Sequence, residues 1–236
     1  MNESSAIPTF TSTCSNCGAA LGGTFCSRCG QEHRYERLRV SHWLHDALDA
    51  AASLDSRVWR TIAALTVRPG RMARDYVEGR RAPFVSPLRY AVATCALWFF
   101  AVVLVNDEAE TSAIWWIEYG QLINLASVPF MAATYQLPFL ASRYNYAETL
   151  TFTLYATGHV FLWRAALAAS SVVGVPGNVL LIADNVLYLG YTAWALWQFH
   201  AGRVRWRPLR VFGALLGASI FGAALNVALM LLSPPA

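Results

Sequence analysis

Residues 66–105 read TVRPGRMARDYVEGRRAPFVSPLRYAVATCALWFFAVVLV, and this stretch decides the fold. Its first half is basic and rich in turn-forming residues, while its second half is apolar and holds no formal charge after Arg89. At ~1.5 Å per helical residue, an apolar helix of this length nearly spans a bilayer core of ~30 Å. The chain before the stretch looks water-soluble and the chain after it looks lipid-soluble, so the stretch marks where the chain enters a membrane.

Composition supports a membrane protein with several crossings. Hydrophobic residues make up 56% of the chain, above the roughly 45–50% typical of soluble domains. The net charge of +4 is carried by 18 arginines without any lysine, and the arginines lie beside apolar segments. This pattern lacks the dense basic face of a nucleic-acid-binding protein, so we expect no nucleic-acid partner.

Five apolar segments predict an all-α membrane protein with about five transmembrane helices. They cover residues 88–105, 121–141, 148–170, 177–199 and 209–232 of a helical bundle that begins at residue 87 and runs to residue 236. Pro129 and Pro138 could make the second segment kinked or re-entrant. Arginine-containing connections alternate with neutral or acidic ones, which predicts a cytoplasmic N-terminus and an outward C-terminus.

A zinc ribbon, a small domain built around one metal ion, is predicted upstream of the bundle in residues 14–31, CSNCGAALGGTFCSRCGQ. The pairs Cys14/Cys17 and Cys26/Cys29 can each direct two thiolates at one ion, and four thiolates form the closed tetrahedral site of structural zinc. Disulfides, a redox thiol pair or iron are the alternatives. Residues 1–13 are polar and read as a disordered tail, and a zinc-thiolate site in residues 14–31 would favour a reducing compartment.

The short spacer between the two cysteine pairs predicts a very small domain. Leu21 and Phe25 are the only large apolar residues in it, so we expect them to form its core, with Gly22 and Gly23 in a turn. So little apolar surface cannot stabilise a fold alone, and the metal would be the main source of stability.

Residues 32–86 predict amphipathic helices on the cytoplasmic membrane surface. One covers residues 40–52, a second follows Asp55, and a third lies in GRMARDYVEGRR, residues 70–81, which we call the collar. Arginines in the collar could anchor the chain by the positive-inside rule, or bind a phosphate, an anionic lipid headgroup or a carboxylate of a partner protein. The candidates are Arg71, Arg74, Arg80 and Arg81.

The CGQ ending of the cysteine segment, followed by RPGRMARDYVEGRRAPFVSPLRY and an apolar helix, resembles a bacterial family of multi-pass inner-membrane proteins classed only as a domain of unknown function. Residues 138–163, PFLASRYNYAETLTFTLYATGHVFLW, resemble a second motif of that family, in which Tyr146, Glu148 and His159 match. Thr149 and Tyr155 stand where the family pattern implies histidines, which weakens any metal or proton chemistry for this motif. The resemblance implies a fold but no established activity.

Ionisable groups inside the apolar segments are candidate functional residues, because charges are costly in lipid. Glu148, Tyr155 and His159 share one helical face and could form a proton or cation path, or could simply pack. Arg164 and Asp184 lie equally far from the turn near Gly174, so an antiparallel hairpin would pair them.

Small residues in the last segment recur at spacings of four and suit close helix packing, within the bundle or against a second copy of the chain in a homo-oligomer. They are Gly213, Gly217, Ala218 and Gly222.

No catalytic motif is present, so we expect no enzyme. The leading hypothesis is a membrane-anchored adaptor that recruits a protein or lipid partner through the zinc ribbon and the collar. The alternative is a small transporter or channel that uses Glu148, His159, Arg164 and Asp184.

Overall fold

The computed structural model describes residues 13–31, 56–105, 119–120, 122–202 and 206–232. These residues form helices and turns, and their one extended pairing is an isolated bridge between Thr13 and Ala20. The α-helices are α2 (Ser56–Val67), α3 (Pro69–Val77), α4 (Pro87–Val105), α6 (Val128–Gln136), α7 (Tyr146–Ser170), α8 (Gly177–Phe199) and α9 (Arg207–Leu232). The expected tail and the expected helix over residues 40–52 lie outside the described residues.

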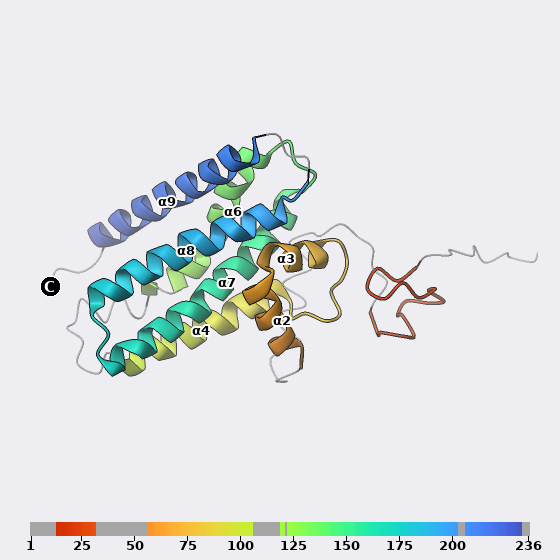
Figure 1. Ribbon diagram of the computed structural model, residues 1–236, viewed down its shortest axis with the longest axis horizontal. Helices are drawn as coiled ribbons and strands as arrows, with labels where there is room; N and C mark the ends of the chain where they lie inside the picture. Colours follow the sequence, from red (N-terminus) through yellow and green to blue (C-terminus); the bar gives the residue numbers. More distant parts are fainter. Residues whose placement is uncertain (1–12, 32–55, 106–118, 121, 203–205, 233–236) are drawn as a thin grey trace, which may run out of the picture.

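Helices α4, α7, α8 and α9 lie side by side, and α2, α3 and the cysteine segment lie at one end of them (Figure 1). Three stretches are long and apolar enough to cross a membrane: Pro87–Val105, Gly177–Phe199 and Arg207–Ala228. The expected count of five is therefore not confirmed. In the second segment α6 has nine residues, about 14 Å of helix, and a 3-10 turn, Leu137–Phe139, follows it.

Helix α7 is long but more polar than the three candidate spans, because it is the centre of the bundle. Its residues 148–161 are all buried except Thr157. Helices α4 and α6 pack against it, as do α2, α3 and α8. Other helices therefore cover its polar side chains, such as His159 and Arg164. Because little of α7 would face lipid, the helix does not need an apolar surface on every side.

A capping box starts α7. The N–H of Glu148 donates to the Asn145 side chain at 2.8 Å, and the N–H of Asn145 donates to Glu148 Oε2 at 2.7 Å. Each such cap stabilises a helix by ~1 kcal/mol. Glu148 thus has a local structural role at the helix N-terminus.

Helices α4 and α7 run parallel and pack unusually closely at one glycine. A Cβ added to Gly158 would lie 2.9 Å from Tyr90 Cδ1 and 3.0 Å from the Cα of Ala91. Further along, the Trp98 and Phe161 rings stack with centroids 5.2 Å apart. The absence of a side chain at position 158 lets the two backbones approach.

Helix α3 packs into the protein, where a membrane-surface helix was expected. Met72 and Ala73 are fully buried, and the apolar face of α3 lies on α7 and α8. A Cβ on Gly70 would lie 2.6 Å from Gln198 Cβ and closer still to the backbone of α8. An amphipathic sequence pattern indicates which face of a helix is apolar, but it does not indicate whether lipid or protein covers that face.

Two of the small residues of helix α9 face other parts of the same chain. A Cβ on Gly217 would meet Thr134 at 3.6 Å, and a Cβ on Gly213 would meet Pro138 at 3.8 Å. Gly222 faces open space. The first two glycines therefore serve packing of α9 against α6 and the turn that follows it.

Candidate metal centre and the basic end of the bundle

The sulfur atoms of Cys14, Cys17, Cys26 and Cys29 all lie within 4.8 Å of one another. The Cys14 and Cys29 sulfurs are 3.6 Å apart, as are those of Cys17 and Cys26. Disulfide sulfurs are bonded at ~2.05 Å, so these are free thiols. Four sulfurs at ~2.3 Å from one tetrahedral ion would lie ~3.8 Å apart. The geometry of the four thiols therefore suits a metal ion.

Two matching turns present the thiols. The N–H of Gly18 donates to the carbonyl of Cys14, and the N–H of Gly30 donates to that of Cys26, both at 2.8 Å. Gly18 has φ 73° and Gly30 has φ 71°, in the left-handed region that glycine adopts without strain. The glycine after each cysteine pair is thus required by the turn.

The expected apolar core of this segment is wrong. Phe25 exposes 62% of its surface, and Leu21 is only partly buried. The four sulfurs occupy the centre of the fold, which leaves no space there for an aromatic ring. Apolar packing therefore stabilises this segment little, and a metal bound by the four thiols would supply the stability.

The thiols do not ionise alike. The Asn16 side chain, followed by a backbone N–H, lowers the pKa of Cys29 to about 6. Backbone N–H groups in its own turn also lower the pKa of Cys26. The pKa of Cys17 is instead raised, to about 11. The N–H of Ala19 opposes this rise, but loss of solvent and the three neighbouring thiols outweigh it. The lowered pKa values of Cys26 and Cys29 favour their thiolate forms, which are the forms that bind a metal ion.

Gln31 joins the cysteine segment to the connection between α3 and α4. Its Nε2 donates to the carbonyl of Gly79 at 2.6 Å and to Ser15 Oγ at 2.9 Å, and its Oε1 accepts from the N–H of Ala82 at 3.3 Å. Ser15 Oγ also donates to the Gly79 carbonyl, at 3.1 Å. Gln31, the glutamine of CGQ, therefore contacts Gly79 of the collar.

Replacing Gln31 by alanine should release the cysteine segment from the bundle without loss of metal. The change removes three hydrogen bonds of Gln31, each contributing ~0.5–1.5 kcal/mol. Hydrogen–deuterium exchange should rise at residues 79–82, while the metal content stays constant. Thr24→Ala, at an exposed position of the same segment, is the control. Loss of metal in Gln31→Ala would show that Gln31 supports the metal site itself.

Two of the four candidate arginines hold the protein together. Arg74 Nη2 donates to the carbonyl of Gln198 in α8. The Arg81 guanidinium lies 5.8 Å from the centre of the Tyr76 ring, a cation–π distance. These two side chains are thus engaged within the chain.

The other two arginines face outward. Arg71 is exposed, and Arg80 Nη1 lies 3.9 Å from Asp75 Oδ2 at the edge of a pocket. Arg60 and Arg68 line the same pocket. Arg60 and Arg68 could not be recognised from sequence, because only the hairpin of α2 and α3 brings them opposite Arg80.

His159 is buried and has partners on both ring nitrogens. Its Nδ1 lies 2.8 Å from the hydroxyl of Tyr90, and its Nε2 lies 3.2 Å from Thr66 Oγ1. The ring also stacks on Tyr191 of α8, with centroids 5.3 Å apart. His159 therefore ties α7 to α2, α4 and α8.

Tyr155 lies on the same face of α7 as Glu148 and His159. It donates its hydroxyl proton to the carbonyl of Val85 just before α4. The three residues of the expected path thus bind separate parts of the chain, and each one positions a different element.

Arg164 and Asp184 form the ion pair expected from their equal depth. Arg164 Nε lies 2.8 Å from Asp184 Oδ1, and Arg164 Nη2 lies 3.0 Å from Asp184 Oδ2. The guanidinium also lies 5.1 Å from the centre of the Trp98 ring. The pair therefore links α7 to α8 and packs against α4.

Asp184→Ala should destabilise the bundle by about 2–3 kcal/mol, because it leaves an arginine unpaired among apolar helices. The double variant Arg164→Leu/Asp184→Leu should recover most of this loss. Thermal unfolding in detergent measures both effects. Equal losses in the single and double variants would contradict the pairing.

His200 follows α8 and is almost fully enclosed. Its ring stacks on Phe139 with centroids 3.7 Å apart, and Tyr144 and Phe199 also contact it. Neither ring nitrogen has a hydrogen-bond partner in the described part of the chain. Burial, followed by the charge of Arg74, lowers the pKa of His200 to about 3, so the ring is neutral at pH 7.

Acid should therefore weaken the fold through His200. Unfolding returns the pKa to ~6.5, so the unfolded chain binds the extra proton and stability falls as pH drops from about 6.5 toward 3. The slope is ~1.4 kcal/mol per pH unit within this window. His200→Phe should flatten it in unfolding measured between pH 7 and pH 4. An unchanged slope would contradict this role.

A family model described as "Protein of unknown function (DUF3667)" matches residues 55–100. No curated protein and no solved structure matches the chain. The matched residues include α2, α3 and the first part of α4, so they contain the Gly79 contact of Gln31 and the lining arginines of the pocket. Over residues 55–100, the chain is therefore similar to the DUF3667 proteins of unknown function.

Proposed function

We propose that the protein is a membrane-anchored adaptor, in which the helical bundle holds a zinc ribbon and a basic surface at the cytoplasmic face of a bacterial inner membrane. One observation carries the proposal: Gln31 and Ser15 bind Gly79, which fixes the cysteine segment beside the collar. Metal centre and arginines then form one surface, suited to recruiting a cytoplasmic protein or an anionic lipid.

Zinc is the metal that best fits the four thiols. A set of four cysteines leaves no open coordination position, which favours structural zinc over a catalytic metal. We expect about one zinc per chain in freshly reduced protein, measured by elemental analysis. Iron in its place, or less than half a zinc per chain, would overturn the assignment.

The cytoplasmic orientation is supported by the distribution of arginine. Arg74, Arg143 and Arg207 lie at the end of the bundle where α4, α7 and α9 begin. At the other end, residues 100–105, 166–180 and 222–232 contain no arginine. By the positive-inside rule, the arginine-rich end faces the cytoplasm. Protease protection of tags at the two termini of the full chain tests this orientation.

Phe25 offers a contact point for a protein partner. It is an exposed aromatic residue directly before Cys26, and aromatic residues are enriched among those that dominate binding energy. In-cell photo-crosslinking from the ribbon should capture a defined partner, and Phe25→Ala should abolish the crosslink without loss of zinc. Thr24→Ala should leave the crosslink intact. Equal crosslinking in both variants would argue against Phe25.

The transporter alternative has less support. His159, Glu148 and the Arg164–Asp184 pair all have partners within the chain, and the adaptor role needs neither transport nor catalysis. A pH-dependent flux in liposomes that His159→Ala or Glu148→Gln abolishes would favour the transporter and sink the adaptor.

A further inference from the structure

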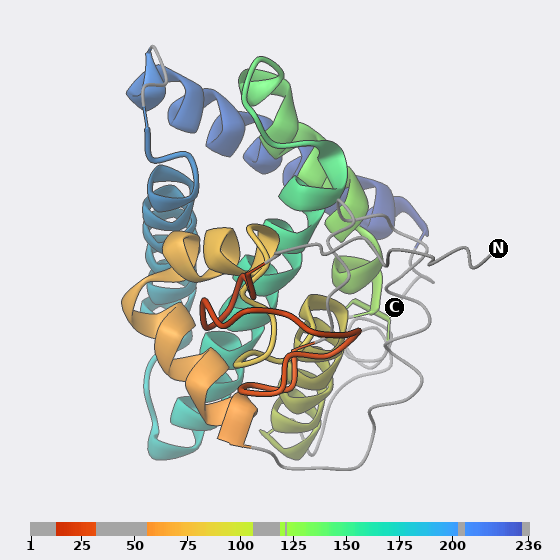
Figure 2. The ribbon, with the colours of Figure 1, turned by 90° about the vertical axis from the view of Figure 1, so that its right-hand side faces the viewer.

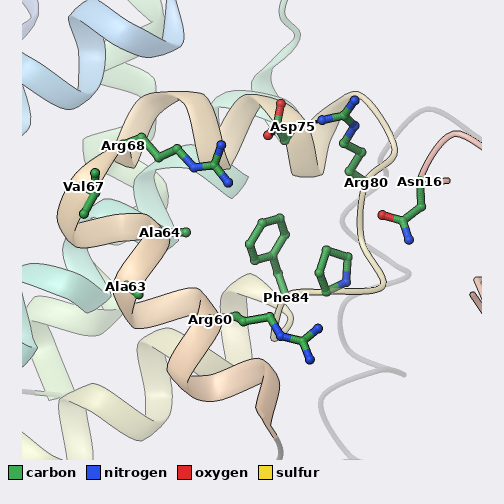
Figure 3. A pocket seen from close by; sticks show the side chains of 10 residues that line it. Asn16, Arg60, Ala63, Ala64, Val67, Arg68, Asp75, Arg80 and Phe84 are labelled. Atoms are coloured by element: carbon green, nitrogen blue, oxygen red, sulfur yellow. Dashed lines mark ion pairs between the residues drawn. The ribbon is translucent and has the colours of Figure 1, made fainter.

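A pocket of about 460 Å³ lies between α2, α3 and the connection to α4 (Figure 3). Its charged lining consists of Arg60, Arg68, Arg80 and Asp75. Asn16 of the cysteine segment also lines it. The pocket thus lies where the ribbon, the collar and the entry to α4 meet.

The pocket has a positive charge that its own carboxylate does not neutralise. Three guanidinium groups face one carboxylate, and the Arg80–Asp75 distance of 3.9 Å is too long for a hydrogen bond. Arg60 contacts only the Ser56 hydroxyl, at 3.1 Å, and Arg68 has no side-chain partner, as far as the described residues extend. These cations are available to an incoming anion.

One wall of the pocket is apolar. Ala63, Val67 and Pro83 form this wall. Figure 3 shows the Phe84 ring between the side chains of Arg68 and Arg60, at the base of the pocket, where Phe84 is only 9% exposed. On the same helix as Arg60, Trp59 exposes 70% of its surface, and Val67 exposes 69%. A small inorganic anion would leave this apolar surface unused, whereas an amphiphilic anion would cover it.

Position along the chain favours a lipid as that amphiphile. Phe84 lies just before α4, a candidate membrane span that begins at Pro87. The pocket is therefore next to the point where the chain enters the bilayer. Guanidinium groups bind phosphate oxygens through paired hydrogen bonds.

We propose that the pocket binds the phosphate of an anionic phospholipid with a phosphomonoester headgroup. The guanidinium groups of Arg60, Arg68 and Arg80 hold the phosphate, and the hydrocarbon part lies along Val67 and Pro83. The two negative charges of such a headgroup match the net charge of the lining. This inference rests on the proposed recruiting role of the basic surface and gives that surface a ligand.

Lipid titration of the full-length protein in detergent tests the proposal. The probes are short-chain phosphatidic acid, short-chain phosphatidylcholine, glycerol 3-phosphate and inorganic phosphate, and native mass spectrometry counts the bound molecules. We expect phosphatidic acid to bind well above phosphatidylcholine. Arg68→Gln should weaken this binding at least tenfold. Arg71→Gln, which changes an exposed arginine of the adjoining helix α3 outside the pocket lining, should leave it unchanged.

Several results would overturn the proposal. Equal losses in Arg68→Gln and Arg71→Gln would mean general surface charge. Glycerol 3-phosphate or inorganic phosphate binding as tightly as phosphatidic acid would mean a water-soluble phosphate ligand and exclude the lipid. Because Arg68 is exposed, its glutamine variant should fold, and circular dichroism verifies this.

The lipid result is separable from the adaptor role. Loss of lipid selectivity with an intact Phe25-dependent crosslink would overturn the pocket alone. Selective lipid binding without any partner crosslink would overturn protein recruitment and leave the pocket standing.

Discussion

Cys26→Ser should reduce the metal content from about one ion per chain to nearly none and unfold the ribbon. Apparent binding free energies of structural zinc in small zinc domains are about 10–16 kcal/mol, and here little else stabilises the segment, since Phe25 is exposed. Elemental analysis measures the metal. Hydrogen–deuterium exchange should show residues 13–31 fully exchanged, with α4, α7 and α8 still protected.

Cys95→Ala is the matched control, because it removes a buried thiol of α4 and leaves the four clustered sulfurs in place. Its metal content should equal that of the parent protein. A Cys26→Ser protein that keeps a full complement of metal would contradict the four-cysteine site. If the helical bundle unfolded together with the ribbon in Cys26→Ser, the ribbon and the bundle would not be independently stable.

Gly70→Ala should cost about 3 kcal/mol or more, at the upper end of overpacking effects. The new methyl group would collide with the carbonyl oxygen of Ala195 and the N–H of Phe199. These are helix backbone atoms, which cannot move aside as a flexible side chain can. Helix α3 would have to lift from α8, which exposes Met72 and Ala73, two fully buried residues.

Thermal unfolding in detergent and protease sensitivity between α2 and α4 measure the effect of Gly70→Ala. Gly190→Ala is the control, because position 190 of α8 has nothing within 4 Å of the added atom. It should be neutral or gain up to ~1 kcal/mol from helix propensity. Similar stability of the two variants would show that α3 does not pack tightly on α8.

Local patterns predicted the local parts of this structure. The cysteine turns could be read from sequence because each needs only a few consecutive residues and a glycine. The Arg164–Asp184 pair followed from hairpin geometry, since two helices joined by a short turn have a fixed relative depth. Helical secondary structure in the apolar segments followed from composition.

Contacts between distant segments could not be predicted in this way. The Gln31–Gly79 contact joins two motifs that looked independent, and the pocket joins Arg60 to Arg80 through the α2–α3 hairpin. The five-span count treated α7 as one more apolar segment. The polar residues of α7 make it less apolar than the three candidate spans, and most of them are buried against neighbouring helices.

The central position of α7 has a consequence for how the chain is assembled during synthesis. Figure 2 shows α7 within the group of helices and not at its edge. An arginine without a partner among apolar helices is costly, and the partner of Arg164, Asp184, is synthesised one helix later. We therefore expect α7 and α8 to associate early as a charge-neutral hairpin, before the rest of the bundle packs around them.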